Sequence, residues 1–190
     1  NLLALMQVYG KRLLGYSSIA QVGYMLLALG IGLTFGLPSA VAAGLYLLVG
    51  HAVMKGLAFL CKGICHYYCG ASRLDQLDGM VHRMPVVTVC FAVGLAGLAG
   101  IPPLAGFVGK WQLLASLLAR PSAGRVIMTV LFAANVLLSL GYYLPIIGRL
   151  FRATDGGGRV RVSAWMLAPV LALAMAVVLF GVYPQPLLEV

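Results

Sequence analysis

Five long apolar segments dominate this chain of 190 residues. A helix that crosses a bilayer needs about 20 largely apolar residues. The chain is 62% hydrophobic and only 9% charged, and a water-soluble fold of this size could not bury so much apolar surface. The sequence therefore predicts an all-α, polytopic transmembrane helix bundle of about five spans. The expected spans are 13–34, 40–65, 85–118, 126–147 and 164–182.

Positive charge is distributed unevenly over the connections between these segments. The net charge is +9, and cytoplasmic loops of membrane proteins carry an excess of Lys and Arg. We therefore read the basic residues as determinants of topology and expect no nucleic-acid partner. The prediction is a multi-pass protein of the inner (plasma) membrane, with residue 11 on the cytoplasmic side and the C-terminus outside. One side would carry Lys11, Arg12, Arg73, Arg83, Arg149, Arg152, Arg159 and Arg161, and the other Arg120 and Arg125.

The third segment is too long for a single straight helix. Its roughly 34 residues would extend about 50 Å as an α-helix, against a hydrocarbon core of about 30 Å. Gly100, Pro102, Pro103 and Gly106 interrupt its middle and cannot continue a regular helix. We expect a broken helix, with a first half near 85–100 and a second half from about residue 107. Broken helices mark ion sites in many transporters, and the alternative is a simple kink or two short helices.

Lys110 follows this break by four residues. A lysine at membrane depth costs roughly 2.5–3.5 kcal/mol on insertion scales, so such residues are usually functional. We interpret Lys110 as a candidate proton carrier, provided that water reaches it. The alternative is that its long side chain extends to the membrane surface.

Three further titratable residues could extend a proton path. His51 and Lys55 lie one helical turn apart on one face of the second segment, and a histidine can both accept and release a proton near neutral pH. They could instead be a polar pair that holds neighbouring helices together. Lys11 opens the first segment, where alone it would be an ordinary anchor. Ser17 and Gln21 follow it and could line a hydrated path or simply join helices.

The remaining polar residues do not predict a second type of chemistry. Cys61, Cys65 and Cys69 form a stripe on one helix face, which is poor geometry for a tetrahedral metal site, and we expect small buried residues. The sequence contains no nucleotide-binding loop and no pair of carboxylates within a span, and we expect no cofactor. We assign Lys62 and His66 mostly to the membrane interface. Aromatic belts at the bilayer edges would take Tyr67, Tyr68, Tyr142, Tyr143 and Tyr183.

Several of these motifs resemble those of one known family. Residues 11–24 (KRLLGYSSIAQVGY), 51–60 (HAVMKGLAFL) and 100–110 (GIPPLAGFVGK) resemble, in the same order, stretches of the antiporter-like membrane subunits. Residues 183–187 (YPQPL) are similar to the final segment of that family. The family comprises subunits of respiratory complex I (NuoL, NuoM and NuoN type), of Mrp Na+/H+ antiporters (MrpA and MrpD) and of membrane-bound hydrogenases. The resemblance covers residues 1–190 as the C-terminal part of a proton-translocating antiporter-like transmembrane domain.

The resemblance implies a role for each matching lysine and histidine. Lys110 corresponds to the broken-helix residue in the exit half of the channel, and Lys11 to a lysine that connects two half-channels. His51 and Lys55 correspond to residues of a central hydrophilic axis. The family's upstream glutamate–lysine pair is expected before residue 1. Tyr9 stands where an acidic residue is often found two positions before the first lysine.

Three hypotheses remain open at this point. The leading one is a proton-translocating, non-redox subunit of a complex I-like NADH:quinone oxidoreductase or related hydrogenase. The second is an Mrp-type Na+/H+ antiporter subunit, and the third is a structural membrane scaffold. The expected partners are other membrane subunits, the lipid bilayer and protons or sodium ions. The His51–Lys55 pair together with Lys110 favours the NuoL, MrpA and MrpD branches over a NuoM type, and disfavours a NuoN type without excluding it.

Overall fold

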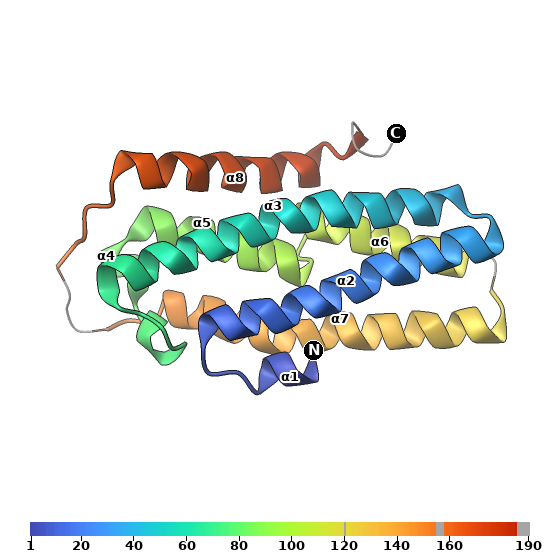
Figure 1. Cartoon of the computed structure of the whole chain (residues 1–190), viewed down its shortest axis with the longest axis horizontal. Coiled ribbons are helices and arrows are strands. Elements are labelled where there is room, and N and C mark those ends of the chain that lie inside the picture. The colour runs from blue at the N-terminus through green and yellow to red at the C-terminus, as the bar shows by residue number, and fades with distance from the viewer. Residues whose placement is uncertain (120, 155–157, 186–190) are drawn as a thin grey trace.

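A computed structural model describes residues 1–119, 121–154 and 158–185, and this part of the chain is helical without strands (Figure 1). This confirms the predicted all-α polytopic bundle. The elements are α1 (Leu2–Leu5), α2 (Gly10–Phe35), α3 (Pro38–Cys69), the 3-10 turn η1 (Asp75–Leu77), α4 (Met80–Arg83), α5 (Pro85–Ala99), α6 (Ala105–Leu118), α7 (Ala123–Leu150) and α8 (Ala164–Val182).

Five crossings arise from four long helices and one divided helix. Helices α2, α3, α7 and α8 are each long and apolar enough to cross a membrane. Helices α5 and α6 follow one another along the bundle and together make the remaining crossing (Figure 1). The expected spans therefore match the observed helices, although several helices are longer than predicted. Helix α3 extends to Cys69, beyond the predicted end at residue 65, and so includes His66 as well as Lys62.

The helix ends follow local sequence rules. Gly36 ends α2 with φ of 59°, a left-handed conformation that glycine adopts without steric cost. Pro38 occupies the first turn of α3, where its missing N–H is not needed. The two helices are thus joined by a tight turn and pack closely as an antiparallel pair.

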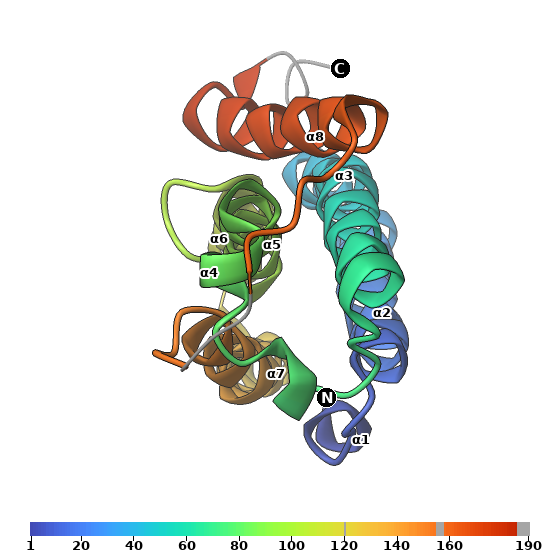
Figure 2. The same cartoon turned by 90° about the vertical axis from the view of Figure 1, so that its left-hand side faces the viewer.

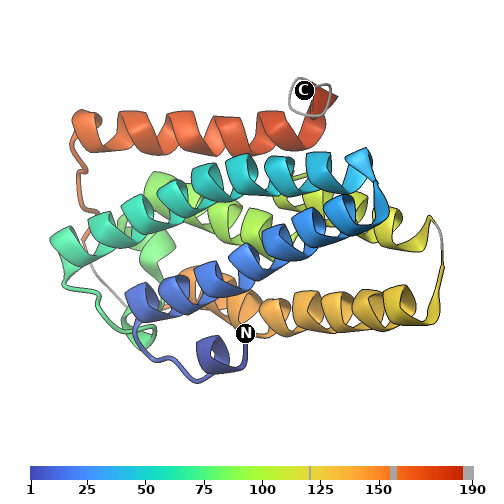
Figure 3. The same ribbon diagram turned by 45° about the vertical axis from the view of Figure 1, so that its right-hand side comes forward.

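Helix α3 packs against α2, α5, α6 and α8, and in Figure 2 it lies between α8 and α2, facing α5 and α6. Helix α7 packs against α5 and α6 on the opposite side from α8 (Figure 3). Helix α8 lies at the periphery of the bundle, since only 11% of its most apolar 18-residue stretch is buried. It nevertheless touches the break directly, because a Cβ atom on Gly181 would collide with the backbone of Pro103 and Leu104. The Tyr46 hydroxyl also donates a hydrogen bond to the Phe180 carbonyl, which joins α3 to α8.

The two ends of the bundle differ in charge. The end that contains the start of α2, the 70–84 connection and the end of α7 carries the larger predicted basic group (Figure 1). Here Asp78 accepts from Arg149 at 3.4 Å and from Arg152 at 3.0 Å. The opposite end carries Arg125, which is buried and donates to the Ser116 carbonyl at 2.6 Å. Among the expected loop residues, Arg120, Gly156 and Gly157 lie outside the described residues.

Candidate functional site

The break in the third crossing lies where the sequence predicts it. Helix α5 ends at Gly100, whose φ of 88° is left-handed, and α6 begins at Ala105, two residues earlier than expected. The Pro102–Pro103 bond between them is cis. Gly106 packs against the Gly97 backbone so closely that no Cβ atom would fit. The start of α6 is therefore packed against α5 and α3, with Ala105 and Gly106 buried, whereas Pro102 and Pro103 at the tip of the turn are exposed on the side of the bundle.

Lys110 turns back toward this break. Its side chain is only 6% exposed, and Nζ donates to the carbonyl oxygens of Leu98 at 2.8 Å and Ala99 at 3.0 Å. These are the last carbonyls of α5, which a helix end leaves without intrahelical partners and with partial negative charge. A Cβ atom at Gly100 would lie 3.0 Å from Lys110 Cδ, so the absence of a side chain at Gly100 leaves space for the lysine side chain. The break thus supplies both the acceptors and the space for a buried ammonium group.

Lys55 is held differently, by an unbroken helix. It is also 6% exposed, and Nζ donates to the Leu14 carbonyl at 2.6 Å and to the Ser17 hydroxyl. One turn further along α2, Gln21 donates to the Leu98 carbonyl at 3.2 Å. Ser17 thus contacts Lys55, and Gln21 shares the Leu98 carbonyl with Lys110. The polar face of α2 therefore lies beside both lysines, as the lining of a shared path would.

His51 lies one turn before Lys55 on α3, close enough for its charge state to be coupled to both Lys55 and Lys110. Its Nδ1 atom is buried and has no hydrogen-bond partner in the part of the chain that the structure describes. The structure thus brings His51, Lys55 and Lys110 together in the interior of the bundle.

A tyrosine cluster, defined as Tyr24, Tyr142 and Tyr143, lies beside these lysines. Tyr142 and Tyr143 are 4% and 0% exposed, so their assignment to an aromatic belt is wrong. The Tyr142 hydroxyl donates to Asn1 Oδ1 at 2.8 Å, and Asn1 Nδ2 donates to the Tyr24 hydroxyl at 3.1 Å. The Tyr24 ring in turn faces Lys110 Nζ, 5.9 Å from its centroid.

Tyr143, the third tyrosine of the cluster, lies on the side of Lys55. The Tyr143 hydroxyl is buried next to Ser17, the residue that binds Lys55, and has no hydrogen bond of normal geometry within the described residues. Sequence reasoning missed this cluster because Tyr142 and Tyr143 lie only four or five residues from the predicted end of their span. Their burial depends on packing between α2 and α7, which no local pattern reveals.

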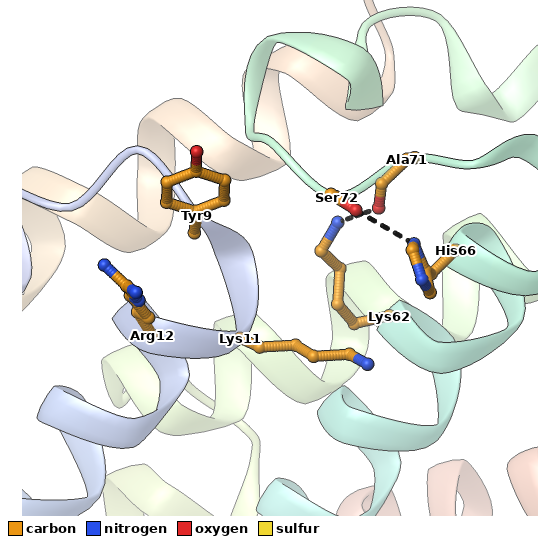
Figure 4. Close-up of a pocket in the computed structure, with 7 residues that line it drawn as sticks. All are labelled: Tyr9, Lys11, Arg12, Lys62, His66, Ala71 and Ser72. Atoms are coloured by element: carbon orange, nitrogen blue, oxygen red, sulfur yellow. Dashed lines mark hydrogen bonds between the residues drawn. The ribbon is translucent and has the colours of Figure 1, made fainter.

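Lys11 does not join the interior lysines. It lies exposed at the start of α2 and lines a pocket of about 250 Å³ at the basic end of the bundle (Figure 4). We call this the basic pocket; its lining residues are Tyr9, Lys11, Arg12, Lys62, His66, Ala71 and Ser72. Lys62 is only 1% exposed and donates to the Ala71 carbonyl. Lys62 therefore lies at the end of the bundle where it was expected, but its side chain is buried in protein and does not extend to the surface.

The interior lysines meet neutral acceptors. Among the described residues, the ion pairs are Arg73–Asp75, Arg149–Asp78 and Arg152–Asp78, all at the basic end. Lys55 and Lys110 contact carbonyl and hydroxyl oxygens instead. Either lysine could lose or gain a proton without breaking an ion pair, which suits a group that exchanges protons.

Curated relatives align along nearly the whole chain. F420H2 dehydrogenase subunit N of Methanosarcina mazei is 33% identical over 200 residues, covering 100% of this chain and 39% of the relative. NADH-quinone oxidoreductase subunit N 1 of Streptomyces griseus is 35% identical over 185 residues, covering 96% of this chain and 37% of the relative. The chain therefore spans less than half the length of these relatives. Both are N-type subunits, so they do not support the preference for the other branches that the His51–Lys55 pair suggested.

Solved structures share the fold. A chain of respiratory complex I from Thermus thermophilus superposes with a TM-score of 0.76 at 31% identity, covering 99% of this chain and 41% of that chain. A chain of the Mrp complex from Dietzia sp. gives a TM-score of 0.81 at 25% identity, covering 98% and 42%. A chain of a membrane-bound sulfane sulfur reductase, an archaeal respiratory membrane complex, gives 0.83 at 26% identity, covering 98% and 37%.

Residues 1–144 match the family described as NADH:quinone oxidoreductase/Mrp antiporter, TM. This match covers more than half of the chain, and it agrees with the relatives, the solved structures and the resemblance of the three motifs. With its apolar helices, the chain is a multi-pass membrane protein segment and belongs to the NADH:quinone oxidoreductase/Mrp antiporter transmembrane family.

Proposed function

We propose that this chain is the C-terminal part of a proton-translocating subunit in a complex I-like NADH:quinone oxidoreductase or a related respiratory complex. In this proposal the subunit has no redox centre of its own and works with other membrane subunits. The curated relatives are subunits of NADH-quinone oxidoreductase and F420H2 dehydrogenase, which supports this class of complex.

One observation carries the proposal. Two lysines are buried at membrane depth, and each is held by neutral oxygen atoms. Burying an ammonium group is expensive, and a purely structural polar contact does not require a charge. The expense is understandable if the group must change its protonation state during turnover.

The proposed path runs through Lys55, His51 and Lys110, with water molecules between them. Movement of charge elsewhere in the complex would change the proton affinity of each lysine in turn. Lys11 would serve the end of the path at the basic pocket, since it lies at the start of the same helix that carries Ser17 and Gln21. Protons would leave past Lys110 along α6.

The decisive experiment uses the intact parent complex in membrane vesicles. We expect Lys110→Ala and Lys55→Ala to assemble normally but to reduce proton pumping at least tenfold, because each removes a proton-carrying group. Pumping is measured by quenching of a pH-sensitive dye, and assembly by native gel electrophoresis. Unchanged pumping in both variants would favour the structural scaffold, because that role tolerates neutral residues.

The same vesicles separate the leading proposal from a second one, an Mrp-type Na+/H+ antiporter subunit. The likeness of this chain to a chain of the Dietzia Mrp complex supports that second proposal. A proton pump coupled to electron transfer should work equally well without sodium. Proton movement that requires a sodium gradient, and is abolished by Lys110→Ala, would favour the antiporter.

The proposed orientation places the basic end in the cytoplasm and the C-terminus outside, in the inner (plasma) membrane. The concentration of arginine and lysine at that end supports it. Reporter fusions after Gln76 and after Pro121 test it: a cytoplasmic reporter should be active only at the first position. Activity at the second position alone would reverse the orientation.

A further inference from the structure

The basic pocket is a built feature with fixed walls. The Gly10 N–H donates to the Ser72 carbonyl at 3.3 Å, and the Leu74 N–H donates to the Val8 carbonyl at 2.9 Å. Tyr9 and Arg73 form an isolated antiparallel bridge between the same two segments. These backbone contacts tie the start of α2 to the connection that follows α3. The pocket between them is therefore held open by backbone structure and not by mobile side chains.

A buried lysine forms the floor of this pocket (Figure 4). Lys62 passes directly against Gly10, where a Cβ atom would collide with its Cε atom. Its ammonium group donates to the Ala71 carbonyl, which uses one of its three N–H groups. Burying a cation with so few partners is energetically unfavourable unless an opposite charge compensates it.

The rest of the lining increases the positive charge. Lys11 and Arg12 lie on the α2 side, and His66 lies on the α3 side, where its Nδ1 atom is 3.0 Å from the Ser72 hydroxyl (Figure 4). Among the described residues, no carboxylate lines the pocket. The nearby carboxylate of Asp75 is already paired with Arg73, at 3.2 Å. Lys11, Arg12 and Lys62 therefore place three cationic side chains in the pocket without a counter-charge.

The backbone adds to the same effect. The N-cap residue of α2 is Tyr9, which provides no side-chain cap. The Gly10 N–H is taken by the Ser72 carbonyl, which leaves the N–H groups of Lys11 and Arg12 without an intrahelical acceptor. A helix N-terminus carries partial positive charge and offers N–H donors to anions. Arg12 stacks over the Tyr9 ring at 5.3 Å, which restrains its guanidinium group beside these donors.

We propose that the basic pocket binds a phosphate group, and that the phosphate is the headgroup of an anionic phospholipid. Phosphate matches the donors present, which are two ammonium groups, a guanidinium group, a hydroxyl group and backbone N–H groups. Lipid is the favoured source because the pocket lies at the end of the membrane helices, next to exposed apolar side chains. Met6 is 77% exposed, Val8 49% and Tyr67 72%, and these can contact acyl chains. Basic pockets between transmembrane helices are known to bind such headgroups.

The test uses the intact parent complex in nanodiscs of phosphatidylglycerol or phosphatidylcholine. A phosphatidylglycerol probe with a photoactivatable group near its phosphate should label the 67–84 segment of the native complex. We expect Lys62→Gln and Arg12→Gln to reduce this labelling at least tenfold. The matched control is Arg73→Gln, which removes a cation at the same end that is already paired, and its labelling should equal that of the native complex. Equal labelling of all four proteins would overturn the proposal.

Further outcomes distinguish the possible sources of the anion. If radiolabelled inorganic phosphate binds the native complex and not Lys62→Gln, while the lipid probe does not label the segment, the phosphate site stands and the lipid source is overturned. If carbodiimide links the ε-amino group of Lys62 or Lys11 to an acidic residue of another segment, a protein carboxylate fills the pocket and the proposal fails. Arg12→Gln changes an exposed side chain, so it remains informative if Lys62→Gln does not assemble.

Discussion

Lys55 and Lys110 are equally buried, but the bundle satisfies their ammonium groups in different ways. Lys110 donates to two carbonyl oxygens that are free to accept only because α5 ends at Gly100. Lys55 receives one carbonyl that already belongs to an unbroken helix, together with the Ser17 hydroxyl. A broken helix gives up its own hydrogen bonds to hold a cation, whereas an intact helix must use a side chain.

This difference suggests different sensitivities to substitution. The Lys110 site depends on backbone conformation, so changes at glycine should damage it while leaving every titratable residue in place. The Lys55 site depends on one hydroxyl group, so it should respond to a small side-chain deletion. The following variants test this contrast in the intact complex.

The largest effect is expected for Gly100→Ala. A non-glycine residue in the left-handed region costs about 1–2 kcal/mol, and the added Cβ atom would press on Lys110 Cδ. We expect proton pumping to fall at least tenfold in vesicles although Lys110 is retained. The control is Gly36→Ala, which has a similar left-handed φ of 59° but open space around the Cβ position. Equal losses in both variants would show that strain alone, and not Lys110, explains the effect.

A smaller effect is expected for Ser17→Ala. Lys55 would keep the Leu14 carbonyl but lose its second acceptor, which is worth about 0.5–1.5 kcal/mol. This corresponds to a reduction in pumping of roughly twofold to thirteenfold. Ser139→Ala removes a similarly buried hydroxyl that donates to the Val136 carbonyl, and its pumping should remain normal. If pumping is unchanged in Ser17→Ala, the Leu14 carbonyl is sufficient and the contrast with Lys110 disappears.

The smallest effect is expected for Tyr143→Phe. Its hydroxyl is buried without a partner within the described residues, so removing it should not lower the thermal stability of the complex. Because this hydroxyl lies next to Ser17, we expect pumping to fall about twofold with a changed solvent isotope effect. Tyr46→Phe should show the reverse, with lower stability from the lost bond to Phe180 and normal pumping. A normal isotope effect in Tyr143→Phe would exclude the tyrosine cluster from proton transfer.

Local sequence patterns were sufficient for much of this architecture. Pro102 and Pro103 predict the break together with the flanking Gly100 and Gly106. A single proline is not sufficient, since Pro145 and Pro169 lie inside the continuous helices α7 and α8. The apolar runs predict the crossings for a similar reason, since each depends only on residues near in sequence. The two-residue difference at the start of α6 reflects the usual imprecision of helix ends.

The contacts that build the site depend on residues far apart in the chain. Nothing near Lys55 indicates that Leu14 and Ser17 will be its partners, 41 and 38 residues away. The burial of Lys62 and Tyr143 was not predicted because each lies near the end of a span, where the sequence pattern of a buried polar residue resembles that of an interface residue. Whether such a residue faces lipid or protein depends on which helix packs beside it.

The contact between Gly181 and the break also has a consequence for biosynthesis. Helix α8 is the last of the described helices to leave the ribosome, yet its backbone covers Pro103 and Leu104. Until α8 docks, the Pro103 carbonyl and the Leu104 backbone would lack this protein neighbour. The turn is therefore fully packed only when the final helix is in place, and a large side chain at position 181 would oppose that last step of assembly.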